Sequence, residues 1–133
     1  MKRIRILALI TGLAVDLIGT TILSTALTFA FVAVRSASGQ RPEAIVQTLA
    51  RDPLFLVIGY AGGIVFTLLG AYITARMSRP YSTINTLLFG TISTVLIVFF
   101  ASMYPLWYNI LCVLTIIPLS LIPGYLVSRK PPP

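Results

Sequence analysis

Asp16 is the residue whose type and position most demand a chemical explanation, because it is the only acid within any apolar run of this sequence. Its run extends from Ile6 to Val34. A carboxylate at the centre of a bilayer costs roughly 2.5–3.5 kcal/mol on insertion scales, so it needs polar partners. Small or polar residues recur around it at a spacing of four, which places them on one face of a helix. They are Gly12, Asp16, Thr20, Ser24 and Thr28.

Helical rise places Asp16 roughly 13 Å below the start of the hydrocarbon core, close to the middle of the membrane. The same count on the other predicted helices gives candidate polar partners at that depth, namely Thr67, Thr91, Thr94 and the turn at Pro118. No lysine or arginine lies at this level, which favours the neutral acid. Two interpretations stay open: Asp16 links helices by hydrogen bonds, or it binds a proton or a cation beside a cavity.

The residue types needed for catalysis are largely missing. The sequence has no histidine, a single cysteine and three acidic residues. It offers no nucleophile–base pair, no paired carboxylates and no glycine-rich phosphate loop. Cys112 allows no intramolecular disulfide, and zinc-ligand spacing is absent. We therefore expect no catalytic residue, no metal site and no cofactor, and predict that the protein is not an enzyme.

Composition places the chain among membrane proteins. Hydrophobic residues make up 57% of its 133 residues and charged residues only 10%, whereas soluble domains carry about 25% charged residues. We predict an all-α polytopic protein, one domain over 1–133, with four transmembrane helices in an antiparallel bundle. A short amphipathic helix over about 42–51 is expected on the outer surface. The predicted spans are about 6–34, 54–75, 81–103 and 106–127.

Charge predicts the orientation in the membrane. The net charge is +7, and cytoplasmic segments of membrane proteins carry the excess of lysine and arginine. Seven basic residues fall on one side, namely Lys2, Arg3, Arg5, Arg76, Arg79, Arg129 and Lys130, against Arg35, Arg41 and Arg51 on the other. The prediction is a bacterial inner-membrane protein with both termini in the cytoplasm. Nucleic-acid binding is not expected, because no basic face lies on a soluble module.

Rows of small residues predict how the helices pack, because they let two backbones approach closely. The second span carries Gly59, Gly63, Thr67, Ala71 and Ala75 at a spacing of four, with Gly62 and Gly70 beside that row. The third span repeats the spacing with Ser82, Thr86, Gly90 and Thr94. We expect the first two spans to form a tight hairpin. The predicted packing residues are Gly12, Gly59, Gly63, Gly70 and Gly90.

The second and fourth spans have similar ends. Each opens on Pro-Leu-aromatic, and each closes on a tyrosine with an arginine four residues later. This similarity suggests duplicated helical hairpins over 1–80 and 81–133, or it reflects only the recurrence of proline, tyrosine and arginine at the ends of membrane helices. Pro118 and Pro123 are expected to interrupt the fourth span, since proline removes a helical hydrogen bond.

Several local patterns carry a resemblance to other proteins. They are Pro42-Glu43, the ending Gly70–Arg76, the turn at Arg79-Pro80 and the opening Pro105–Tyr108, which together span about two-thirds of the chain. On these patterns the chain resembles a broad, poorly characterised group of small bacterial inner-membrane proteins with four helices, which implies no activity. Asp16 also gives an analogy to the small multidrug resistance transporters, which have one essential acid in their first helix. An aspartate in place of glutamate, the long outer loop and the other three helices depart from that family.

The sequence supports two main functional hypotheses. The first is a non-enzymatic membrane protein that acts in the lipid bilayer by helix packing, as an accessory or scaffold subunit or a self-associating bundle. Its partners would be further copies of itself or a larger membrane complex. The second is a small, dimeric, proton-coupled transporter with Asp16 as the coupling site. A lipid- or peptide-binding sensor using segment 41–51 is a third possibility.

Overall fold

The computed structural model describes residues 4–129 and is helical over most of that range. Lys2, Arg3 and Lys130, which the predicted orientation counts as cytoplasmic, lie outside the described residues. The elements are α1 (Ile6–Ala37), α2 (Pro42–Leu49), α3 (Pro53–Met77), α4 (Ser82–Phe99), a short 3₁₀ helix η1 (Ala101–Met103) and α5 (Leu106–Ser128).

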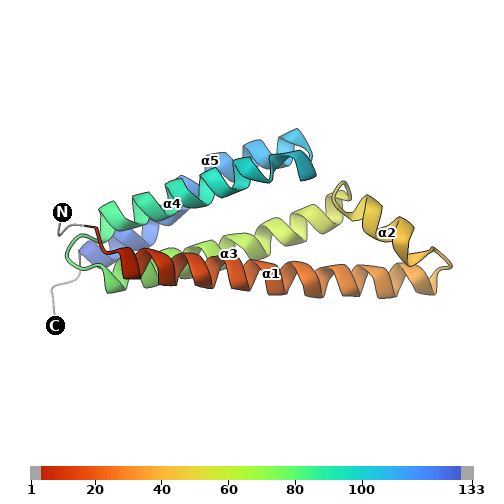
Figure 1. Ribbon diagram of the computed structural model, residues 1–133, viewed down its shortest axis with the longest axis horizontal. Helices are drawn as coiled ribbons and strands as arrows, with labels where there is room; N and C mark the ends of the chain where they lie inside the picture. Colours follow the sequence, from red (N-terminus) through yellow and green to blue (C-terminus); the bar gives the residue numbers. More distant parts are fainter. Residues whose placement is uncertain (1–3, 130–133) are drawn as a thin grey trace.

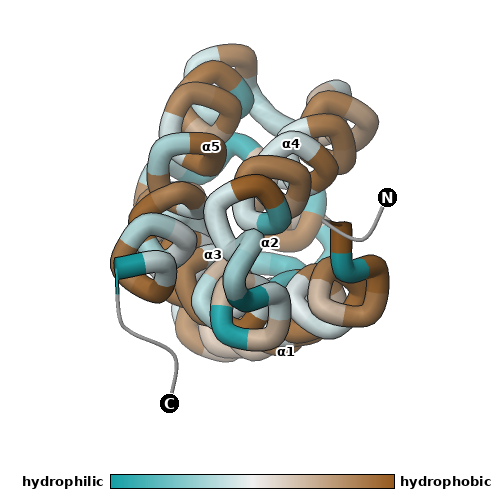
Figure 2. The backbone as a smooth tube through the Cα atoms, turned by 90° about the vertical axis from the view of Figure 1, so that its left-hand side faces the viewer, coloured by the Kyte–Doolittle hydropathy of each residue, from teal (hydrophilic) through white to brown (hydrophobic). Residues whose placement is uncertain are grey.

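Four of these helices, α1, α3, α4 and α5, are long and apolar enough to cross a membrane. Figure 2 shows hydrophobic residues along most of their length. Many of these side chains point away from the bundle, as expected where lipid is the solvent. The predicted all-α, multi-pass membrane fold with four spans is confirmed. α1 has 32 residues, roughly 48 Å of helix against a ~30 Å hydrocarbon core, so it tilts or extends beyond the bilayer.

The four spans pack as two antiparallel hairpins. α1 lies along α3 and α4 lies along α5, and contacts of α3 with both α5 and α4 join the two pairs. Figure 1 shows the hairpins close together where α1 begins and α5 ends, and diverging toward the end that carries α2. We call these the terminal end and the α2 end. The predicted hairpins are therefore units of packing, while their origin by duplication stays a prediction.

α4 ends earlier than predicted, at Phe99 and not at Met103. Pro105 explains the difference, because the residue before a proline is pushed out of the helical region, and Tyr104 is extended. The chain must therefore leave the helix first, and it does so through η1. The Asn109 side chain holds this turn by donating hydrogen bonds to the carbonyls of Ala101 at 2.8 Å and Tyr104 at 3.1 Å.

The end of α1 and the course of α5 also differ from the prediction. α1 continues past Val34 to Ala37, because loss of hydrophobicity does not end a helix; the break comes near Gly39, which has a positive φ of 88°. α5 runs without interruption through Pro118 and Pro123. Prolines are tolerated within membrane helices where neighbouring groups compensate for the lost hydrogen bonds.

α2 is docked on the bundle through its apolar side. Ile45 and Leu49 are buried against Phe55 and Leu56 of α3, and partly buried side chains of α1 complete this cluster. Asp52 fixes the connection that follows. Its carboxylate pairs with Arg35 at the end of α1, and it accepts hydrogen bonds from the N–H groups of Leu54 at 2.9 Å and Phe55 at 3.1 Å at the start of α3.

The Asp52 cap gives a first prediction, on pH. The hydrogen bond from the Phe55 N–H, followed by that from Arg35, holds the pKa of Asp52 below its usual range. Because the folded-state pKa is lowered, the stabilisation is fully present at neutral pH and is lost as pH falls below about 4. We expect Asp52→Ala to cost about 1 kcal/mol of local stability and Asp52→Asn less, because asparagine keeps the cap and loses only the Arg35 pair.

Hydrogen exchange of the Leu54 and Phe55 amides in nanodiscs measures this effect. Exchange should be fastest in Asp52→Ala, and wild-type protection should approach that of the variant only in acid. Equal protection of these amides in the wild type and in Asp52→Ala from pH 3 to pH 7 would show that Asp52 does not hold this end of α3.

Candidate functional site

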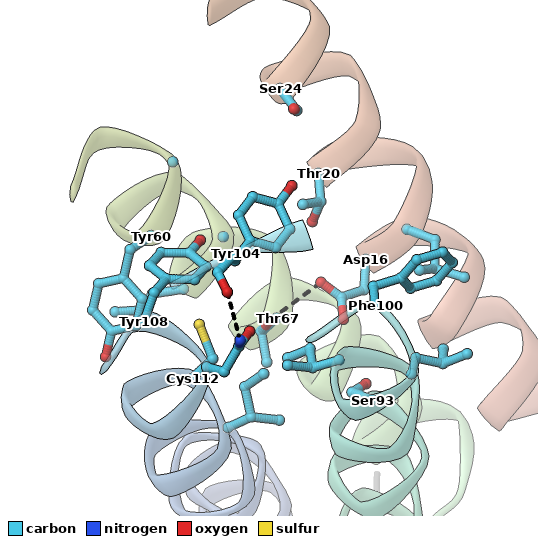
Figure 3. A pocket seen from close by; sticks show the side chains of 18 of the residues that line it. Asp16, Thr20, Ser24, Tyr60, Thr67, Ser93, Phe100, Tyr104, Tyr108 and Cys112 are labelled. Carbon is cyan, nitrogen blue, oxygen red and sulfur yellow. Dashed lines mark hydrogen bonds between the residues drawn. The ribbon is translucent and has the colours of Figure 1, made fainter. Parts of the chain in front are cut away.

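A cavity of about 420 Å³ lies between the four membrane-spanning helices and is partly open. Asp16 and Thr20 of α1, Tyr60 and Thr67 of α3 and Ser93 of α4 contribute to its wall, together with Tyr104, Tyr108 and Cys112 around the start of α5 (Figure 3). Most of the lining is apolar. The polar groups around Asp16 therefore form a small patch within a mostly apolar cavity.

Asp16 is buried in this cavity wall, with only 8% of its surface exposed. Thr67 Oγ1 donates a hydrogen bond to Asp16 Oδ1 at 3.2 Å, which links α1 to α3. The depth count on the sequence put these two residues at one level, and the structure brings them together. Thr20 lies one turn further along α1, lines the cavity and faces the same carboxyl group.

α4 contributes Ser93 to this patch, which the sequence analysis did not single out. Ser93 is 6% exposed, and its hydroxyl is buried without a hydrogen-bond partner in the described part of the chain. It lies toward the Asp16 carboxyl group and lines the cavity. A buried hydroxyl without a partner is uncommon and calls for an explanation.

Three of the residues predicted beside Asp16 are not in this wall. The Thr91 hydroxyl donates to the Leu87 carbonyl of its own helix at 2.9 Å, and the Thr94 hydroxyl donates to that of Gly90 at 2.8 Å. Pro118 is exposed on the outside of α5. They lie at the right depth but on the wrong side of their helices, because packing of α4 on α5 fixes which face of each helix points inward.

The predicted packing glycines divide into two groups. Gly12 and Gly70 lie where α1 and α3 nearly touch, since a Cβ on either would come within 2.6 Å of the other's carbonyl oxygen. Gly90 lies against Ser120 of α5. These three positions behave as packing residues.

Gly59 and Gly63 do not pack against another helix, and this part of the prediction is wrong. A Cβ added at either position would meet no atom within 4 Å, and both glycines line the cavity. The contact row of α3 lies one position earlier, with Gly62 against Leu23 and Phe66 against Gly19. Those large side chains fill the α1–α3 interface and turn Gly59 and Gly63 toward the open space.

Three tyrosines line the part of the cavity nearer the α2 end. The ring of Tyr108 lies between those of Tyr104 and Tyr60, with centroid distances of 5.3 Å and 6.4 Å. The Tyr60 hydroxyl donates to Thr115 Oγ1 of α5 at 3.1 Å, which joins the two hairpins. Tyr108 also packs against the cluster that holds α2. This wall gives the cavity flat apolar surfaces with polar edges.

The terminal side of the cavity is closed. Phe89 is 0% exposed and packs with Leu9 and Ala71, one helical turn below Ser93. Beyond it the interior is filled by small polar residues that are fully buried, namely Thr74, Ser78, Ser82, Asn85, Thr86 and Ser120. Several of them join helices: Thr74 donates to the Ala8 carbonyl at 3.2 Å, and Ser82 donates to that of Gly124 at 3.0 Å.

The charge of the cavity comes from one group. Among the described residues that line it, Asp16 is the single acid and none is lysine or arginine. The described chain also holds no group of three His, Cys, Asp or Glu side chains that could bind a metal. This arrangement can hold a proton or attract a cation.

No family model matches the chain, and no curated protein or solved structure matches it either, so the functional argument rests on this geometry.

Proposed function

We propose that the protein is a small proton-coupled carrier, with the cavity as its substrate site and Asp16 as its coupling residue. One observation carries the proposal: the single acid within the membrane spans is buried in the wall of a chamber that can hold a small molecule. Intramembrane acids are costly, and those that face a cavity commonly mark proton or substrate pathways. The cavity volume lies within the roughly 300–1,000 Å³ typical of small-molecule sites.

In this proposal Asp16 alternates between holding a proton and holding the substrate. Thr67 donates to one carboxyl oxygen, and the hydroxyl groups of Ser93 and Thr20 lie toward the same carboxyl group. Water that enters the open part of the cavity takes the proton away. The apolar walls strengthen any charge interaction formed inside, because they keep the local dielectric low.

The two hairpins supply the moving parts of the proposal. The close contact of Gly12 with Gly70 supports one rigid pair, and that of Gly90 with Ser120 supports the other. Their separation at the α2 end and closure around Phe89 correspond to one state of an alternating-access cycle. Rocking of the hairpins would produce the opposite state. With both termini in the cytoplasm of a bacterial inner membrane, as the basic residues indicate, the open side faces outward.

The scaffold hypothesis stays a second prediction. This hypothesis depends on rows of small residues that a partner helix could contact. Gly12, Gly70 and Gly90 are covered within the chain, and Gly59 and Gly63 line the cavity, so these glycines offer no free contact row to a partner. Chemical cross-linking in native membranes addresses the dimer expected of a small carrier and the self-associating bundle together, and recovery of monomer alone would weigh against both.

Substitution of Asp16 by asparagine tests the carrier directly. Wild-type protein in vesicles with a trapped pH dye is exposed in turn to amphipathic cations, neutral molecules and anions. We expect at least one compound to move protons in the wild type and none to do so in Asp16→Asn. Infrared spectra should also show a protonated carboxyl group that titrates in the wild type and is missing from the variant.

Asp52→Asn is the matched control, because it removes an acid outside the membrane and keeps the α3 cap. It should behave as the wild type in both measurements. If Asp16→Asn and the wild type are identical from pH 5 to pH 8, Asp16 exchanges no proton and the proposal is wrong.

A further inference from the structure

We infer that the cavity takes an amphipathic primary or secondary amine, bound as its ammonium ion by Asp16, Ser93 and Thr20 with its apolar body along the tyrosines. The inference rests on the proposed function and specifies its substrate class. Charge, hydrogen-bonding capacity and shape of the cavity lead to it separately.

Charge selects a cation. Once Asp16 has lost its proton, its carboxylate attracts positive charge and repels anions, since no lysine or arginine is among the described lining residues. An isolated ionised carboxylate is costly in an apolar setting, and a bound cation removes that cost. A neutral ligand would leave the carboxyl group without this compensation.

Hydrogen bonding selects an amine that carries N–H groups. Thr67 donates to Asp16 Oδ1, and Ser93 and Thr20 lie toward the same carboxyl group. The buried Ser93 hydroxyl has no partner in the described structure and faces the same space, and Thr20 Oγ1 provides a third oxygen nearby. A primary ammonium group has three N–H donors for these three acceptors. A quaternary ammonium ion has none, so the oxygens of Asp16, Ser93 and Thr20 would receive no hydrogen bond from the ligand.

Shape and lining select an apolar, preferably aromatic body. Leu17, Ile64, Leu96 and Ile97 line the cavity together with the tyrosines. The rings of Tyr104 and Tyr108 offer flat surfaces on which an aromatic group can stack. The inferred ligand therefore spans the chamber, with its charged head at Asp16 and its body toward the α2 end.

Binding of the ammonium ion releases the proton of Asp16. The amine arrives as RNH₃⁺ and meets the protonated acid of Asp16. The carboxyl O–H bond breaks, its electron pair stays on oxygen, and the proton passes to water in the open part of the cavity. One proton leaves for each ammonium ion bound, and the ion keeps all of its N–H bonds.

Three ligands with one aromatic body test the inference: 2-(1-naphthyl)ethylamine, its N-trimethyl derivative and 2-(1-naphthyl)ethanol. Equilibrium dialysis against full-length protein in nanodiscs, corrected with empty nanodiscs, gives their affinities. We expect the amine to bind about tenfold more tightly than the quaternary ion, since each hydrogen bond to a charged group is worth that much or more. The alcohol should be the weakest of the three.

Substitutions at Ser93 assign the selectivity. Ser93→Ala should weaken the amine by about tenfold and leave the quaternary ion nearly unchanged. Ser93→Cys keeps the size of the side chain but is a poor acceptor, and it should do the same if the alanine variant does not fold. Thr91→Ala is the matched control, because its hydroxyl is exposed on the same helix and bonds to its own backbone. It should match the wild type with all three ligands.

The inference is overturned if the quaternary ion binds as well as the amine, if neither Ser93 variant changes the preference, or if none of the ligands binds. In the last case the infrared titration and the vesicle assay with Asp16→Asn still decide the proposed function, because neither depends on this ligand series.

Discussion

Valine in place of Gly12 is expected to destabilise the four-helix bundle strongly, while the same change at Gly63 is tolerated. A Cβ at Gly12 would lie 2.6 Å from the Gly70 carbonyl oxygen and 3.3 Å from Thr74 Cβ. The Gly70 oxygen belongs to the backbone, so no side-chain rotation relieves the contact. α1 and α3 must separate, and overpacking of this kind typically costs 1–3 kcal/mol and occasionally more, so we expect about 3 kcal/mol.

The contact at Gly12 also matters for the site. A Cβ built on Gly70 lies 3.2 Å from Asp16 Cβ, so separation of the two backbones also moves the coupling residue. The free energy of unfolding, measured by steric trapping in lipid, should fall strongly in Gly12→Val and change little in Gly63→Val, which has no atom within 4 Å of the added Cβ. Equal stability of the two variants would show that the close approach of α1 and α3 does not hold the bundle together.

The same comparison shows what the sequence could and could not predict. The four spans followed from the length and hydrophobicity of each segment, which do not depend on neighbouring helices. The pairing of Asp16 with Thr67 followed from depth, because helical rise gives position along the membrane normal from residue number alone. Both predictions needed only the position of each residue along the membrane normal.

Rotation of each helix about its axis could not be predicted in the same way. In a soluble helix the apolar side points to the core, but on α3 and α4 many large apolar side chains point outward, as expected where lipid is the solvent. Depth alone therefore predicted Thr91 and Thr94 beside Asp16 and did not predict Ser93. Contacts of Gly90 with Ser120 orient α4 so that Ser93 faces the cavity.

The cavity could not be predicted from the sequence, because small residues in a membrane helix have two possible roles. A glycine lets two helices approach, as Gly12 does, or leaves space where no helix comes near, as Gly59 and Gly63 do. The sequence pattern is the same in both cases. Only the positions of large neighbours distinguish them, and here Phe66 and Leu23 occupy the α1–α3 contact and leave the adjacent row open.

Alanine in place of Phe89 is expected to have the second large effect, because this buried ring packs one helical turn from Ser93, on the terminal side of the cavity. Phe89 is fully buried and packs with Leu9 and Ala71 where the two hairpins meet. Loss of a buried phenylalanine costs about 3–5 kcal/mol through the cavity it leaves. That new space would lie one helical turn from Ser93, which lines the cavity. We expect it to extend the cavity toward the terminal end, with lower stability and leakage of protons.

Phe99→Ala provides the control on the same helix, because Phe99 is 79% exposed and points away from the bundle. Vesicles containing each variant are given a pH gradient, and its decay is followed with a trapped dye beside the free energy of unfolding. Phe89→Ala should lose the gradient faster and unfold more easily than Phe99→Ala and the wild type. If Phe89→Ala is destabilised but as proton-tight as the control, the closure depends on the polar residues beyond Phe89, and the barrier between the two sides of the membrane lies nearer to Asn85 and Thr86 than to the cavity.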